Sequence, residues 1–239
     1  MTTIFLKGDC VERMRDISSA SIDFVYFNPP FAITHQPWDE VLPWKDVFHE
    51  CFRILKPTGT LAIHCSVPFN YVLIREAPRA PNYSWYWDKM ATTTPLLAKR
   101  QPLRQMEEVL VWTMGGGGGS RYYPQRVGTE VRQIISRGHT RYVHEETLKP
   151  QEKQTVVGRY QTHLIQMKRT IRGFATRPDA LIELMIKSYT NEGDTILDPT
   201  CYEGLTGVIS QRLGRNWIGI DKHFSASMLT ELSDVIEHV

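Results

Sequence analysis

The four residues Asn28-Pro29-Pro30-Phe31 combine a side-chain amide, two prolines with fixed φ angles and an aromatic ring. They follow an apolar run, Ile22 to Phe27, whose β-branched and aromatic residues predict a buried strand. Because proline cannot donate to a sheet ladder, we expect the strand to end there and to present Asn28 at its carboxyl end. Open α/β sheets bind ligands at that edge. The pattern suits a flat heterocycle with an exocyclic amine; a strand-ending turn before a core Phe is the alternative interpretation.

A second stretch with chemical potential begins at residue 195. A short strand, Thr195 to Leu197, is predicted to end at Asp198-Pro199, followed by a loop through Gly204 and a helix from about 205 to 213. The next strand ends at Asp221. Strand, glycine-containing loop, helix and strand with a terminal acid is the pattern of a nucleoside-type cofactor site, in which the acid binds ribose hydroxyls. A dinucleotide site would need Gly-x-Gly-x-x-Gly, and here only Gly204 and Gly207 stand at such positions.

The elements that must position these residues alternate between strand and helix. Thr3 to Lys7 predicts a strand that stops at Gly8-Asp9, and residues 10–16 predict a short helix before the strand of Asn28. This spacing favours parallel strands, which would bring Asp9 to the same edge as Asn28. Further predictions are helices at 44–55 and 70–75, strands at 60–64, 83–89 and 109–113, a turn at 56–59, and a helix capped by Asp179. The expected fold is α/β, with a doubly wound, mostly parallel sheet.

Composition limits the class of protein. The chain has 239 residues, of which 41% are apolar and 23% charged, as in soluble globular proteins. No apolar run has the length of a membrane span, and the first residues lack signal-peptide architecture. The four cysteines, Cys10, Cys51, Cys65 and Cys201, lie far apart without a CxxC pair. We interpret them as buried thiols in a reducing cytoplasm.

Charge is distributed unevenly along the chain. Between Gly115 and Arg177 there are twelve Lys or Arg and four Asp or Glu, so that the rest of the chain carries −6 within a net charge of +2. This asymmetry indicates an anionic polymer contacted by one region. We therefore divide the chain into 1–114, a basic insertion at 115–168 and 169–239. The insertion begins with a glycine tether, Gly115 to Gly119, which is either native or an engineered linker.

The order of these motifs resembles the permuted β group of amino-methylating DNA methyltransferases, and particularly the small phage and prophage adenine-N6 enzymes. The resemblance runs through nearly the whole chain, because the matching segments occur in the family's order. They are LKGDCVERM, SIDFVYFNPP, WDEVLPW, RILKPTGTLAIHCSVPF, PLRQMEEVLVW, YYPQ and ATRPDALIELMIKSYTNEGDTILDPTCYEGLTGVISQRLGRNWIGID. The family's fold is a Rossmann-like methyltransferase sheet, and in this chain the basic insertion would be its DNA-recognition segment.

The resemblance implies S-adenosylmethionine as cofactor, duplex DNA as partner, no membrane contact, and a bacterial or phage-infected cytoplasm; it leaves a homodimer open. Asn28 and the Pro29 carbonyl would accept the target amine's hydrogens, with Pro30 completing the turn and Phe31 stacking on a flipped base. The implied cofactor-binding residues are Asp9, Cys10, Arg177, Asp198, Thr200, Tyr202, Gly204 and Asp221. The implied DNA-binding residues are Lys99, Arg100, Arg104, Arg121, Arg126, Arg132, Arg137 and Arg141.

Two residues depart from the family's usual Phe-x-Gly-x-Gly cofactor loop. Tyr202 replaces a glycine where backbone approaches the ligand, and Glu203 adds a negative charge. Adenine-N6 methylation is the activity that the resemblance favours, with cytosine-N4 methylation as the alternative within the same chemistry. A non-catalytic DNA-binding or partner subunit with a degenerate cofactor loop is the alternative from another class.

Overall fold

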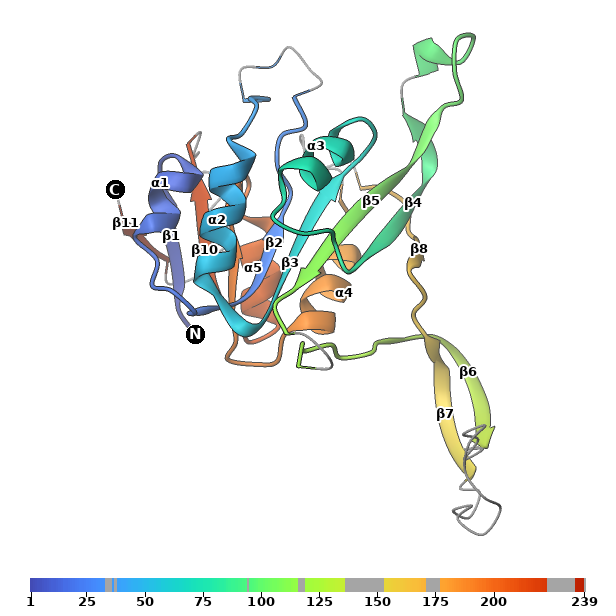
Figure 1. The fold of residues 1–239 in the computed structure, drawn as a ribbon. Coiled ribbons are helices and arrows are strands. Elements are labelled where there is room, and N and C mark those ends of the chain that lie inside the picture. The colour runs from blue at the N-terminus through green and yellow to red at the C-terminus, as the bar shows by residue number, and fades with distance from the viewer. Residues whose placement is uncertain are drawn as a thin grey trace. The chain divides into compact units, whose positions relative to one another are not determined.

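A mostly parallel sheet organises the larger part of the chain (Figure 1). The computed structural model describes residues 1–32, 36, 38–93, 95–115, 119–135, 153–170, 177–222 and 235–238. In these ranges, nine strands form the sheet. In spatial order they are β11 (Val235–His238), β1 (Thr3–Lys7), β10 (Asn216–Asp221), β9 (Thr195–Asp198), β2 (Ile22–Phe27), β3 (Leu55–Cys65), β5 (Arg104–Thr113), β4 (Tyr83–Thr93) and β8 (Leu164–Gln166). The predicted α/β fold class is confirmed.

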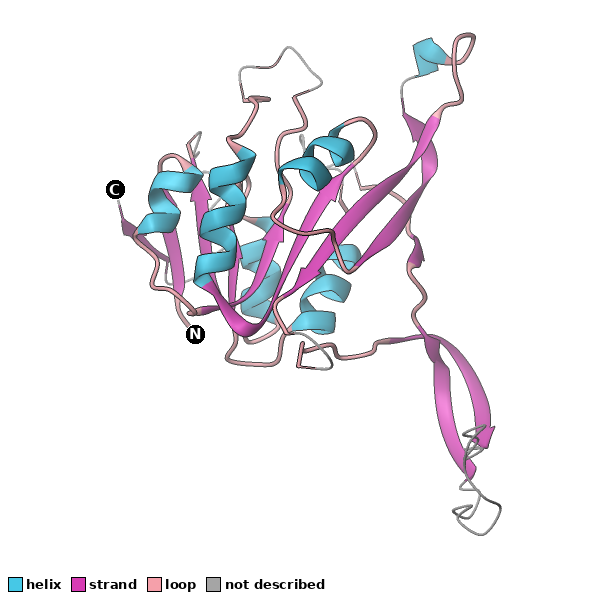
Figure 2. Ribbon diagram, viewed as in Figure 1, coloured by secondary structure: helices cyan, strands magenta, loops and turns pink. Residues whose placement is uncertain are grey.

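Helices cover both faces of the sheet, as Figure 2 shows. One face packs against α1 (Cys10–Arg15), α2 (Trp44–Ile54) and α3 (Phe69–Glu76). The other packs against α4 (Asp179–Tyr189) and α5 (Leu205–Arg212). A short 3-10 helix, η1 (Pro95–Leu97), lies between β4 and β5. Among the described residues, no helix combines the length and apolar character needed to cross a membrane.

The central strand β2 is buried on both sides, as its continuous apolar run predicts. Val25 and Phe27 pack with α1 and α2, whereas Phe24 and Tyr26 pack with α4. Because successive side chains of a strand point to opposite faces, this strand joins the two halves of the core. All four cysteines are buried free thiols, as expected from their spacing.

Strand direction decides which residues share an edge. β1, β10, β9, β2 and β3 are parallel, so their carboxyl ends lie together. β5 is antiparallel to β3 and therefore begins at this edge, and β4, antiparallel to β5, ends there. Asp9 and Asn28 do lie at one edge, but β10 and β9 separate their strands.

Two local predictions were wrong. Residues 56–59 were expected to form a turn, yet β3 begins at Leu55 and runs through them. The register between β2 and β3 shifts there, with Ile22 opposite Leu55 and Phe24 opposite Thr60, so the extra residues are absorbed as a bulge within the strand. Asp179 does not cap α4: Pro178 occupies the N-cap position, and Asp179 is the first helical residue.

Pro124–Thr162 forms a separate compact unit inside the predicted insertion, which was drawn more widely as 115–168. Its described residues form an antiparallel ribbon of β6 (Arg126–Ile135) and β7 (Lys153–Tyr160). The ribbon has a bulge between Val127 and Val131, opposite Gly158. Gly158 has φ of +71°, and a Cβ there would come within 2.5 Å of the Val127 carbonyl oxygen. The insertion's role in target recognition stays a prediction.

Candidate active site

A cavity of about 370 Å³ lies at the carboxyl edge of the sheet. Both stretches singled out in the sequence line it: the turn after β2 and the loop between β9 and α5. The predicted site residues that line it are Cys10, Asn28, Pro29, Pro30, Phe31, Arg177, Asp198, Thr200, Tyr202 and Asp221. Such a volume is in the range of small-molecule and cofactor pockets.

The turn after β2 is fixed by contacts on both sides. The Thr200 hydroxyl donates a hydrogen bond of 3.1 Å to the backbone carbonyl of Asn28, which joins the two halves of the cavity. The Phe31 ring stacks on Phe69, the first residue of α3, with centroids 5.1 Å apart and planes at 23°. One face of Phe31 is therefore supported by the core, while the residue also lines the cavity.

The segment after this turn contributes a carboxylate that sequence reasoning missed. The Ala32 backbone N–H donates to Oδ1 of Asp39 at 2.7 Å, and Ala32 has a positive φ of 53°. Asp39 is buried and lines the cavity together with Trp38 and Glu40. The Asp39 carboxylate thus holds the exit of the turn in a conformation that L-residues rarely adopt.

The loop between β9 and α5 has an unusual backbone at Tyr202, whose φ is +42°. Its N–H donates to Oδ2 of Asp221 at 2.8 Å. Gly204 follows with φ of +65° as the N-cap of α5. The loop therefore keeps a left-handed conformation at the position where the sequence has tyrosine in place of glycine, a conformation that glycine adopts more easily.

Asp198 ends β9 and is buried beneath this loop. Its Oδ2 accepts from the Thr206 hydroxyl, and its Oδ1 accepts from the Thr200 N–H at 3.3 Å. Burial, with a smaller contribution from the nearby negative charge of Asp221, raises the pKa of Asp198 to about 7, although the hydrogen bonds oppose the shift. This carboxyl group can thus change charge near neutral pH.

Asp9 has a structural position close to the cavity. Its Oδ1 caps α1 by accepting from the N–H groups of Val11 at 2.9 Å and Glu12 at 3.2 Å. Its Oδ2 lies 3.0 Å from Nζ of Lys222, which also reaches Glu40 at 3.5 Å. Partial burial would raise the pKa of Asp9, but the Lys222 ammonium and the backbone donors lower it. The cavity wall here is made by Gly8, Cys10 and Lys222.

The charged residues of the lining are mostly acidic. Among the described lining residues six are acidic, Asp39, Glu40, Glu107, Asp198, Glu203 and Asp221. Two are basic, Arg177 and Lys222. A cavity with this charge favours a ligand that carries positive charge.

Arg177 belongs to a buried polar network. Its Nη2 lies 2.5 Å from Oε1 of Glu107, and its Nε lies 3.1 Å from Nδ1 of His64. His64 in turn contacts Glu107 at 2.8 Å and the Tyr26 hydroxyl at 2.6 Å. Sequence reasoning placed Arg177 at the site but missed Tyr26, His64 and Glu107. The sequence feature that could have revealed this network is the presence of His64 and Glu107 at the ends of otherwise apolar strands.

Three of the predicted DNA-binding residues lie near the turn between β4 and β5. Lys99 and Arg100 are exposed in this turn, and Arg104 begins β5. Because β4 ends and β5 begins at the carboxyl edge, the turn lies on the same side of the sheet as the cavity.

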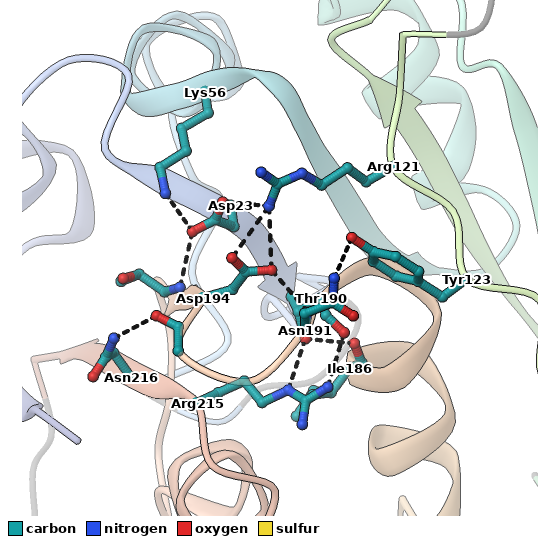
Figure 3. Close-up of polar contacts among 12 residues, drawn as sticks. Asp23, Lys56, Arg121, Tyr123, Ile186, Thr190, Asn191, Asp194, Arg215 and Asn216 are labelled. Atoms are coloured by element: carbon teal, nitrogen blue, oxygen red, sulfur yellow. Dashed lines mark hydrogen bonds and ion pairs between the residues drawn. The ribbon is translucent and has the colours of Figure 1, made fainter.

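Arg121 is placed elsewhere, at the opposite edge of the sheet (Figure 3). Its Nη1 lies 3.1 Å from carboxylate oxygens of both Asp23 and Asp194. Asp23 is buried and also binds Lys56 at 2.6 Å and the Thr195 N–H at 2.9 Å. This arrangement assigns Arg121 a structural role on the larger unit, so we do not include it among the proposed DNA contacts.

The remaining predicted DNA-binding residues lie in the insertion. The Arg126 guanidinium stacks over the Tyr160 ring, 4.0 Å from its centroid. Arg132 forms an ion pair with Glu130 on the same strand. Arg137 and Arg141 lie outside the described residues.

Comparison with known proteins identifies relatives of this chain. Residues 22–230 match the model of the N6/N4 DNA methylase family. The type II methyltransferase M.BamHI of Bacillus amyloliquefaciens is 25% identical over 231 residues, which are 90% of this chain and 53% of that protein. The chain thus spans about half the length of this relative.

Solved structures show the same fold. A crystal structure of the M1.HpyAVI–SAM complex aligns with a TM-score of 0.61 at 18% sequence identity. The alignment covers 98% of this chain and 100% of the M1.HpyAVI chain. The PvuII DNA methyltransferase, described as cytosine-N4-specific, aligns with a TM-score of 0.60 at 18% sequence identity. This alignment covers 92% of this chain and 83% of the PvuII enzyme's chain.

Proposed function

The chain belongs to the N6/N4 DNA methylase family, and from this premise we propose that it methylates the exocyclic amine of adenine (N6) in duplex DNA, using S-adenosylmethionine. The observation that carries the proposal is the hydrogen bond between Thr200 and the Asn28 carbonyl. It joins an amine-accepting turn to a cofactor-type loop within one cavity. A homodimer stays a prediction.

The cavity fits S-adenosylmethionine by charge and by the placement of its donors and acceptors. The cofactor carries a sulfonium and an ammonium group against one carboxylate, and acidic residues outnumber basic ones in the lining. We assign the ribose hydroxyls to Asp221 at the end of β10, where nucleoside-type sites have an acid, and Asp198 lies beneath the loop next to the turn of Asn28. Arg177 offers N–H donors for the carboxylate. When bound, S-adenosylmethionine supplies an electrophilic methyl group on its sulfonium sulfur.

The residues of the turn act on the nucleophile. An aromatic amine is a poor nucleophile because its lone pair is delocalised into the ring. The Asn28 side-chain oxygen and the Pro29 carbonyl accept the two amine hydrogens, which favours a pyramidal nitrogen whose lone pair points at the methyl group. Phe31, supported from behind by Phe69, stacks on the base. Positioning and electrostatics thus account for catalysis.

The target base must leave the helix to reach this cavity, because its amine is otherwise held within the duplex. Lys99 and Arg100, on the cavity side of the sheet, are suited to phosphate contacts. A two-stranded ribbon is also narrow enough to enter the major groove of B-DNA, and Arg126 and Arg132 lie on such a ribbon.

Two observations favour the alternative of a non-catalytic DNA-binding subunit, whose loop no longer binds the cofactor. Tyr202 adds a Cβ and a ring at a left-handed position, and Glu203 adds a negative charge to the cavity lining, which would repel the cofactor's carboxylate. Calorimetric titration of the purified protein with S-adenosylmethionine separates the two functions. Absence of binding at millimolar ligand would contradict the enzyme and support the DNA-binding subunit.

The product identifies the target base. Unmodified genomic DNA is incubated with protein and cofactor, and the digested nucleosides are analysed by mass spectrometry. We expect N6-methyladenine; N4-methylcytosine would support the cytosine alternative. Asn28→Ala should abolish the product and Phe31→Ala should reduce it strongly, whereas Asn191→Ala, at the opposite edge of the sheet, serves as the matched control.

A further inference from the structure

A buried polar network crosses three strands at the wall of the cavity. Tyr26 lies on β2, His64 on β3 and Glu107 on β5. Phe24, Ala62 and Val109 each lie two residues away from one of these polar residues on the same strand, and all three pack on the α4 face. Alternation therefore places Tyr26, His64 and Glu107 on that face as well. The exposed fractions of Tyr26, His64 and Glu107 are 1%, 0% and 7%. Polar side chains at this depth require partners.

The partner that closes the network is Arg177, two residues before α4. Burial would raise the pKa of Glu107, but the Arg177 guanidinium and His64 lower it to about 2. Burial and Arg177 lower the pKa of His64 to about 4. At neutral pH the network therefore contains a charged Glu107–Arg177 pair and a neutral imidazole.

The protons of this network can be assigned from its donors and acceptors. A neutral imidazole donates from one nitrogen and accepts at the other. If Nδ1–H donates to Glu107, Nε2 accepts from the Tyr26 hydroxyl, and Nδ1 cannot accept from the Arg177 Nε–H that also faces it. The other tautomer accepts from Arg177 but leaves Nδ1 and the Glu107 carboxylate as two facing acceptors, so the first arrangement is favoured. In this arrangement Tyr26 and His64 fix the Glu107 carboxylate, and Glu107 fixes Nη2 of Arg177.

We propose that Glu107 is a positioning residue, held by His64 and Tyr26, that directs Arg177 toward the carboxylate of the bound cofactor. The inference rests on the proposed function, because it concerns the amino-acid end of S-adenosylmethionine. An anionic group is disfavoured in a cavity whose charged residues are mostly acidic unless fixed donors receive it. The other basic lining residue, Lys222, is already paired with Asp9 and Glu40. Glu107 offsets the charge of Arg177, so the pair contributes oriented N–H groups and little net charge.

A series of three ligands tests the role of Glu107. S-adenosylmethionine has a sulfonium, an ammonium and a carboxylate, S-adenosylhomocysteine lacks only the sulfonium charge, and decarboxylated S-adenosylhomocysteine keeps the ammonium but lacks the carboxylate. We expect Glu107→Gln to weaken the first two ligands by a similar factor, about tenfold or more, and to leave the decarboxylated ligand unchanged. An equal loss for all three, or a loss for S-adenosylmethionine alone, would overturn the inference, because neither pattern depends on the carboxylate.

The next residue of β5 provides a matched control. Glu108 faces the other side of the sheet and accepts from Asn70 at 3.1 Å, so Glu108→Gln should bind all three ligands like the wild type. Tyr26→Phe removes one hydroxyl and should reproduce the Glu107→Gln pattern more weakly, with a melting temperature that confirms folding. If wild-type protein binds none of the ligands, the proposed function fails and this inference with it. Wild-type binding with an unchanged Glu107→Gln series overturns this inference alone.

Discussion

At the scale of single residues, Tyr202 has the most unusual conformation in the cofactor loop. Its φ of +42° lies in the left-handed region, and its N–H is held by Asp221 at 2.8 Å. The backbone has therefore kept a glycine-type conformation with a larger side chain. Strain of this kind is found at functional sites where surrounding contacts enforce it.

Substitution of Tyr202 can measure this strain. Tyr202→Gly and Tyr202→Ala remove the same ring, but only alanine keeps a Cβ in the left-handed region. We expect the glycine variant to be more stable by about 1 kcal/mol. Urea denaturation measures the difference, and Glu203, which does not have a positive φ, is the control. At position 203, the alanine variant should be more stable than the glycine variant. If glycine were the more stable residue at both positions, the backbone strain at Tyr202 would be contradicted.

Asp198 predicts a pH dependence of cofactor binding. Its pKa is raised to about 7, chiefly by burial, so the carboxyl group is largely neutral below this pH and charged above it. Since a cationic ligand favours the charged form, affinity for S-adenosylmethionine should increase as pH rises from about 6 to about 8. Calorimetry near pH 6.5 in buffers of different ionisation enthalpy should also detect proton release on binding. Asp198→Asn should remove both effects, and a pH-dependent affinity in this variant would contradict the assignment.

At the scale of elements, the sequence was informative where function depends on strand ends. The prolines after Phe27 and after Asp198 predicted where β2 and β9 end, and parallel strands then bring both ends to one edge. The neighbours of each strand cannot be inferred this way. The contact between His64 and Glu107 exists because β5 lies antiparallel beside β3, an order that no local pattern encodes. The ion pairs of Arg121 could not be predicted for a related reason, since its partners Asp23 and Asp194 are distant in sequence.

The position of Arg121 predicts an effect on stability and none on DNA binding. Arg121→Ala removes a charged partner from the buried Asp23 and from Asp194. Lys56 and the Thr195 N–H remain, so we expect a loss of about 1–2 kcal/mol in the free energy of unfolding. Arg100→Ala, in the exposed turn after β4, should leave stability unchanged and weaken DNA binding. Urea denaturation and DNA titration measure the two effects. If Arg121→Ala kept wild-type stability and weakened DNA binding, Arg121 would be a DNA-binding residue.

At the scale of the whole molecule, positive charge is concentrated between residues 115 and 177, while the remaining chain is acidic. An acidic body repels DNA in non-specific orientations, and a basic segment attracts it. The acidic cavity and the basic insertion thus favour ligands of opposite charge, a cationic cofactor and a polyanion. Under the proposed function, the cofactor and the DNA are thus attracted by residues of opposite charge.

The ribbon's share of DNA binding can be obtained from salt dependence. Each phosphate contact contributes about 0.9 to the slope of log affinity against log salt concentration. A variant with Arg126, Arg132 and Arg159 changed to alanine should therefore have a slope smaller by about 2 to 3, with weaker binding at low salt. The matched control changes Arg15, Lys45 and Arg75, which are exposed on the helices of the larger unit, and alters net charge equally. If both variants reduce the slope alike, net charge explains the binding and the ribbon has no special part. A reduction confined to the first variant would establish that the ribbon contacts phosphates.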